Sequence, residues 1–146
     1  MGRSMPAGLA YFAVVFLAGM VLGAFRVFVL EPRFGPIRSV LAELPIMLGL
    51  SWLACDWAIR LFRVPKQAAP RVAMGGFAFL LLVGAELALA LQTTGDSIGE
   101  TLSSFTDPAR AIGLAGQLIF AAMPFLQLVM ERAAPPVDRI GTGERI

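Results

Sequence analysis

The sequence predicts an all-α membrane protein whose four transmembrane helices form an antiparallel bundle. The chain has 146 residues, of which 58% are hydrophobic, and its mean hydropathy is +0.77, a composition that suits lipid as the solvent. A bilayer core of about 30 Å is crossed by about 20 apolar residues of helix, which satisfies its own backbone hydrogen bonds there. Four segments are long and apolar enough, and charges, prolines or glycines bound each of them: residues 9–30, 37–62, 72–91 and 111–130.

These spans define one transmembrane domain over about residues 1–132. Residues 133–146 are expected to be a flexible cytoplasmic tail, because Pro135-Pro136 and mixed charges replace the apolar residues. A cleaved secretory signal is the alternative for the first span, since Arg3 precedes an apolar run that reaches Leu22-Gly23-Ala24. The run is too long for a typical signal core and resumes after Ala24, which favours a retained helix.

The distribution of basic residues predicts the orientation. Basic residues cluster around the loop between the second and third spans: Arg60, Arg63, Lys66 and Arg71. The loop between the third and fourth spans is acidic, with Asp96, Glu100 and Asp107. Short basic loops stay in the cytoplasm, so both termini are expected there. Arginine also outnumbers lysine eleven to one, as in proteins from GC-rich bacteria, and a bacterial inner membrane is the expected location.

Turn signals mark both outer loops. Two prolines in the segment 31–36 predict a short, stiff turn in which Pro32 ends one helix and Pro36 starts the next. In the second outer loop, Ser97 and Glu100 have capping-box spacing, so a short interfacial helix is expected around residues 97–105, with an ordinary polar loop as the alternative. Pro108 is then expected in the first turn of the last helix.

Each span carries a strongly polar residue in its outer third: Arg26, Glu43, Glu86 and Gln117. All four lie about 6 to 10 Å below the outer ends of their spans, at about 1.5 Å per residue. A polar side chain that faces lipid costs about 2 to 3 kcal/mol near the bilayer centre. Small residues such as Gly19 and Gly23 share a face with Arg26, so the four side chains are expected to point into the bundle.

The four residues are candidates for an ion- or proton-binding site. Arg26 is always charged, so one glutamate can stay ionised as its partner, whereas a second carboxylate nearby is expected to hold a proton. The main expectation is that this cluster is structural and that the protein is a structural or accessory membrane component. The alternative is an oligomeric proton- or cation-coupled transporter or channel that uses Glu43 and Glu86.

Composition argues against several other functions. Histidine is absent and Cys55 is the single cysteine, so no internal disulfide, metal site or cofactor is expected. No nucleophile accompanies the two glutamates, which argues against an enzyme. The basic residues fit cytoplasmic loops better than a nucleic-acid surface. The expected partners are the lipid bilayer and either further copies of the chain or a larger membrane complex.

A second group of residues predicts an anchor at the cytoplasmic interface. Asp56 and Arg60 are one helical turn apart near the end of the second span, and Trp52 and Trp57 lie close to them. This pattern is typical of a surface salt pair within an aromatic belt.

Four short motifs support the four-helix interpretation. They are Pro32-Arg33-Phe34-Gly35-Pro36, the run from Glu43 to Leu48, Arg63-Val64-Pro65 and Ala85-Glu86. On these motifs the chain, except its tail, resembles an uncharacterised family of small bacterial four-helix membrane proteins. The resemblance implies the fold and no particular function.

Overall fold

A computed structural model describes residues 2–93 and 108–133, and all the regular elements in this part of the chain are helices. They are α1 (Ser4–Phe25), the π-helical segment η1 (Arg26–Leu30), α2 (Glu31–Phe34), α3 (Pro36–Phe62), α4 (Ala68–Thr93) and α6 (Pro108–Ala133). Four of these helices are long and apolar enough to cross a membrane, in agreement with the four apolar segments of the sequence. The predicted helix around 97–105 and the tail from residue 134 lie outside the described residues.

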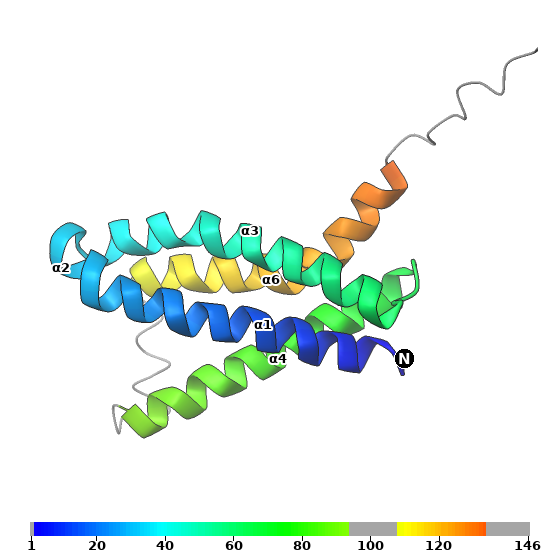
Figure 1. The fold of residues 1–146 in the computed structure, drawn as a ribbon, viewed down its shortest axis with the longest axis horizontal. Coiled ribbons are helices and arrows are strands. Elements are labelled where there is room, and N and C mark those ends of the chain that lie inside the picture. Colours follow the sequence, from blue (N-terminus) through cyan, green and yellow to red (C-terminus); the bar gives the residue numbers. More distant parts are fainter. Residues whose placement is uncertain (1, 94–107, 134–146) are drawn as a thin grey trace, which may run out of the picture.

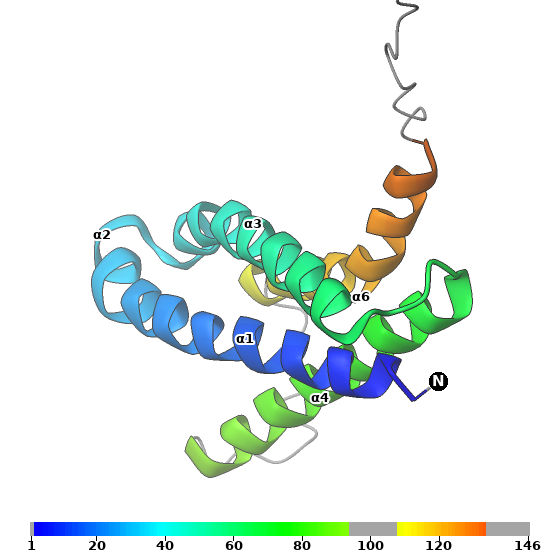
Figure 2. The ribbon, with the colours of Figure 1, turned by 45° about the vertical axis from the view of Figure 1, so that its right-hand side comes forward.

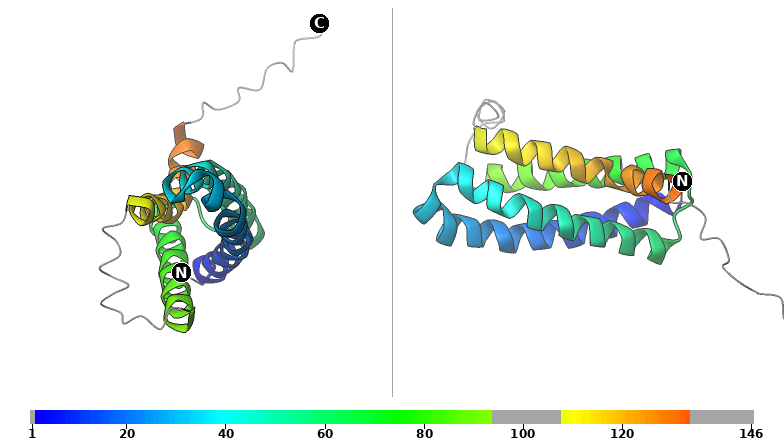
Figure 3. Two further views of the ribbon diagram at one scale, coloured as in Figure 1. Left: turned by 90° about the vertical axis from the view of Figure 1, so that its left-hand side faces the viewer. Right: turned by 90° about the horizontal axis from the view of Figure 1, so that it is seen from above.

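The helices are arranged so that each packs against two neighbours. The ring order is α1, α3, α6 and α4 (Figure 3). The segment α2 lies at one end of the molecule, and the amino terminus lies at the other end with the connection between α3 and α4 (Figure 1). We call these the α2 end and the amino-terminal end. Toward Thr93, α4 diverges from α1 (Figures 1 and 2).

The core combines small residues, mostly alanine, with large apolar and aromatic side chains. Its buried members come from all four long helices and include Ala7, Tyr11, Ala54, Cys55, Ala58, Met74, Ala78, Phe120 and Met123. The outward faces are also apolar, with exposed side chains such as Leu17, Val21, Leu53, Leu80 and Met130. A surface of this kind suits helices surrounded by lipid, where association depends on close packing.

Glycines bring α4 close to both of its neighbours. A Cβ atom at Gly75 would lie 2.0 Å from the carbonyl oxygen of Ala121 on α6. A Cβ atom at Gly8 of α1 would lie 2.8 Å from the carbonyl oxygen of Met74. Gly23, by contrast, lies against no other helix of the chain, because a Cβ atom there would meet nothing within 4 Å.

The first connection is shorter than predicted. Pro32 does not end the first helix; it lies in the first turn of α2, and the helix runs on to Phe34. The break is confined to Gly35, whose φ of 77° is favourable for glycine. Pro36 then starts α3, as expected. The wider turn of η1 accommodates Pro32, which has no N–H to donate and whose ring would clash with the carbonyl group one α-turn earlier.

A second proline shapes α6. The helix bends in its last third (Figures 1 and 2), and Pro124 lies inside it. Proline has no N–H, so the carbonyl group of Phe120, four residues earlier, loses its helical partner. The hydroxyl group of Tyr11 on α1 donates to that oxygen at 3.1 Å, and its ring stacks on Phe120 at 4.3 Å. Tyr11 therefore supplies the donor that Pro124 lacks, and it links α1 to the bend.

Candidate functional site

The structure brings together two of the four predicted polar residues at the α2 end. Arg26 Nε lies 2.7 Å from Glu43 Oε2 of α3. The Nε–H bond of Arg26 does not point toward Glu43 Oε2, so this contact is an ion pair and not a hydrogen bond. Arg26 Nη1 donates to the carboxylate of Glu31. The side chains are 26% exposed for Arg26, 28% for Glu31 and 16% for Glu43, so the cluster is partly buried.

Glu31 was not among the predicted site residues. It lies five residues after Arg26, and residues five apart do not lie on the same face of an ordinary α-helix. The π-helical turn makes i to i+5 backbone bonds, including one from the N–H of Glu31 to the carbonyl group of Arg26, and so brings the two side chains together. The signal available in the sequence was Pro32, which disfavours a regular α-turn before it.

The other two predicted residues form a separate pair between α4 and α6. Gln117 Nε2 donates to both carboxylate oxygens of Glu86, at 2.7 Å each. Glu86 is exposed. Arg110 acts electrostatically on the same carboxylate.

The expected single cluster is therefore divided into two. Among residues 2–93 and 108–133, no hydrogen bond or ion pair joins Arg26 or Glu43 to Glu86 or Gln117. The second carboxylate beside Arg26 is Glu31 and not Glu86. Each group links two neighbouring elements: η1 with α3 through Arg26, and α4 with α6 through Gln117.

The predicted anchor residues are found in different environments. Arg60 Nε donates to Asp56 Oδ1 at 3.0 Å, and the Arg60 side chain is 79% exposed. Trp57 is exposed, whereas Trp52 packs against the core, and its carbonyl group accepts a hydrogen bond from Gln127 at 2.9 Å. Their role as a membrane anchor stays a prediction.

Arg71 is the main residue that the sequence interpretation misplaced. It was counted in the loop, but α4 begins at Ala68, so Arg71 lies in the first turn and is 1% exposed. Its Nη2 atom donates to Glu131 of α6 at 3.3 Å, and Lys66 contacts the same carboxylate at 3.2 Å. The Nε and Nη1 atoms of Arg71 have no hydrogen-bond partner among the described residues. Pro70, a residue suited to the first turn of a helix, was the signal for an earlier start.

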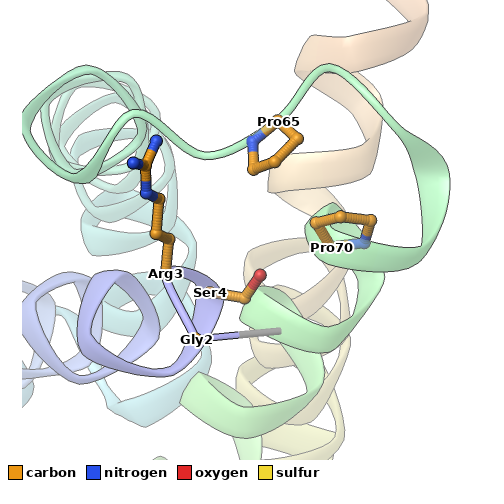
Figure 4. Close-up of a pocket in the computed structure, with 5 residues that line it drawn as sticks. All are labelled: Gly2, Arg3, Ser4, Pro65 and Pro70. Carbon is orange, nitrogen blue, oxygen red and sulfur yellow. The ribbon is translucent and has the colours of Figure 1, made fainter.

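Two cavities lie toward the amino-terminal end. The larger has a volume of about 400 Å³ and is lined by Gly2, Arg3, Ser4, Pro65 and Pro70 (Figure 4). The smaller, about 110 Å³, is lined by Trp52, Asp56, Gln127, Met130 and Glu131.

The described residues provide no metal-binding group of three or more histidine, cysteine or acidic side chains. Cys55 is a free, buried thiol. Comparisons of the chain with protein families, with curated proteins and with solved structures find no match.

Proposed function

We propose that the protein is a structural or accessory component of a bacterial inner membrane. Its helices cross the bilayer as an antiparallel bundle with both termini in the cytoplasm. The observation that carries the proposal is the pair formed by Glu86 and Gln117, which is hydrogen bonded and yet exposed among apolar side chains. This pair marks the face that packs against a partner protein in the membrane.

The surroundings of Glu86 explain why this face needs a partner. Val83 and Leu89, one turn away on either side, are exposed apolar residues, as is Leu118 beside Gln117. A carboxylate that faces lipid costs about 2 to 3 kcal/mol near the bilayer centre. The hydrogen bonds from Gln117 use only part of the accepting capacity of the Glu86 carboxylate, so a donor from a partner helix can bind its remaining lone pairs. A helix over this face also removes the carboxylate from lipid.

The cluster at Arg26 also supports a structural role, because it joins two helices of the chain. A cation held between carboxylates of its own helix and of α3 fixes how the two helices are aligned, as polar side chains do in membrane bundles. Neither of the two cavities described above includes Glu43 or Glu86. The position of these glutamates outside both cavities gives no support to the transport alternative, and we do not adopt it.

Site-specific photocrosslinking in membranes tests the proposal. A photoreactive residue at Val83, which is 39% exposed beside Glu86, should form a covalent adduct with another protein or with a second copy of the chain. The same residue at Leu53 of α3, which is 70% exposed, is the matched control and should give no defined adduct. The Glu86→Leu substitution should reduce the Val83 adduct. A Val83 variant that crosslinks only to lipid would overturn the proposal.

A further inference from the structure

The face of α4 and α6 around Glu86 carries a base as well as an acid. Arg110 lies in the first turn of α6, seven residues before Gln117, a spacing that places both side chains on the same side of the helix. It is exposed, and it acts electrostatically on the Glu86 carboxylate, which also accepts the hydrogen bonds from Gln117. These three residues, which we call the Glu86 face, therefore provide an acid, a base and an amide whose charges balance.

This balance of charge restricts the kind of partner that fits the Glu86 face. A partner helix with an extra cation would place it beside Arg110, and like charges repel strongly where water is excluded. An extra carboxylate would be repelled by Glu86 in the same way. A purely apolar helix would cover both charged groups without giving either a new hydrogen bond. The partner that fits has to bring an acid and a base of its own.

A second copy of the chain meets this requirement. In a two-fold symmetric dimer the same face is used on both sides, so the acid of each copy can meet the base of the other. With the axis normal to the membrane, equivalent residues lie at equal depth, and Arg110 already acts on Glu86 across their difference in depth within one chain. The four charges then alternate in sign around the axis, which favours association. The exposed apolar side chains of Val83, Leu89 and Leu118 are available to pack around them.

We propose that the chain forms a two-fold symmetric homodimer through the Glu86 face, in which Glu86 of each copy pairs with Arg110 of the other. The inference rests on the proposed function, because it names the partner that covers Glu86. Gln117 is a positioning residue in this arrangement, since its hydrogen bonds hold the carboxylate in place. The dimer removes both carboxylates from lipid, where each would be costly.

Energy transfer between purified full-length copies in phosphatidylcholine vesicles tests the dimer. Donor and acceptor dyes are attached through Arg33→Cys in a Cys55→Ala background, and the parent should show transfer that unlabelled copies compete away. Glu86→Leu and Arg110→Leu should each weaken association about tenfold, the effect expected for the loss of one charged hydrogen bond. The control Arg38→Leu, which removes an exposed charge from α3, should stay within about twofold of the parent.

Charge reversal distinguishes pairing between copies from pairing within one copy. Glu86→Arg and Arg110→Glu each place two like charges on one Glu86 face, so neither variant should associate with itself. A mixture of the two variants should associate, because every charged contact across the axis then joins opposite signs. A mixture of Glu86→Arg with Arg38→Glu is the matched control and should associate less.

Two results would refute the dimer. One is transfer in the parent no greater than random mixing in the bilayer gives. The other is no association in the mixture of Glu86→Arg and Arg110→Glu when both variants are monodisperse on gel filtration. Crosslinking at Val83 separates this failure from failure of the proposed function. An adduct with a different protein refutes the dimer and leaves the proposed function standing, whereas an adduct with lipid alone refutes both.

Discussion

Arg26 is the residue on which the α2 end depends. It contacts one carboxylate in its own helix and another on α3, so two negative charges share one cation when both carboxylates are ionised. The cation is therefore harder to replace than either acid. Loss of one glutamate leaves Arg26 with the other, whereas loss of Arg26 leaves two carboxylates close together without a partner.

We expect Arg26→Met to lower the free energy of unfolding by about 1 to 3 kcal/mol, the cost of leaving partly buried charged groups unpaired. Glu43→Gln should cost less, because Glu31 still pairs with Arg26. Thermal unfolding in detergent measures both effects. Adding Glu31→Gln to Arg26→Met should restore part of the loss by removing one unpaired charge. An Arg26→Met protein as stable as the parent would show that the cluster does not hold the helices together.

Tyr11 is a second residue with a specific structural role. Tyr11→Phe keeps the ring that stacks on Phe120 but removes the hydroxyl group that donates to the Phe120 carbonyl oxygen. We expect a loss of about 1 to 3 kcal/mol in unfolding free energy, because that oxygen becomes unsatisfied in a buried position. Pro124→Ala restores the helical N–H, so Tyr11→Phe should cost less in a Pro124→Ala background. Equal costs in the two backgrounds, measured by thermal unfolding, would contradict the link between Tyr11 and Pro124.

At the scale of the helices, the contact between α4 and α6 depends on a missing side chain. Gly75 and Gly76 are adjacent on α4, but only Gly75 lies against α6; a Cβ atom at Gly76 meets nothing within 4 Å. We expect Gly75→Ala to push the helices apart and to reduce the yield of folded, monodisperse protein on gel filtration. Gly76→Ala is the matched control and should behave like the parent. If the two variants behave alike, the close approach of α4 and α6 is not required.

The helices were predictable from the sequence, but some of their ends were not. Apolar length, bounded by Pro36 and Arg63, located α3 (Pro36–Phe62) to within one residue. Pro32 and Pro70 caused the errors, because a proline in the first turn of a helix looks the same in sequence as one that ends a helix. The third span was predicted to begin after Pro70, which placed Arg71 in a loop. The burial of the Arg71 charge was therefore not predicted.

At the scale of the whole molecule, the pairing of polar residues was predictable only in part. Similar depth predicted one cluster of four residues, whereas the structure pairs Arg26 with Glu43 and, separately, Glu86 with Gln117. Depth does not say which helices are neighbours, however, and four helices can be arranged around a ring in more than one order. The π-helical turn that brings Glu31 to Arg26 depends on packing, which residue counting does not describe.

The proposed orientation can be tested on the whole chain by cysteine labelling. Cys55 is the single cysteine and is buried, so Cys55→Ala provides a cysteine-free background. In that background, a membrane-impermeant maleimide should reach an Arg33→Cys residue from the periplasm. A Lys66→Cys residue should react only after the inner membrane is permeabilised, since it lies in the basic loop. The reverse labelling pattern would place both termini in the periplasm.

The pairing of Arg26 with Glu31 has a consequence for biosynthesis. Both residues belong to the first continuous helix, Ser4–Phe34, so this helix carries the counter-ion of its own cation. In the proposed membrane arrangement, this helix can enter the bilayer before α3 has been synthesised without exposing an unpaired guanidinium group to lipid. Glu43 then enters with α3 and meets a cation that is already in place. The ion pairs can thus form in the order in which their residues are translated: Arg26 with Glu31 first, and then with Glu43.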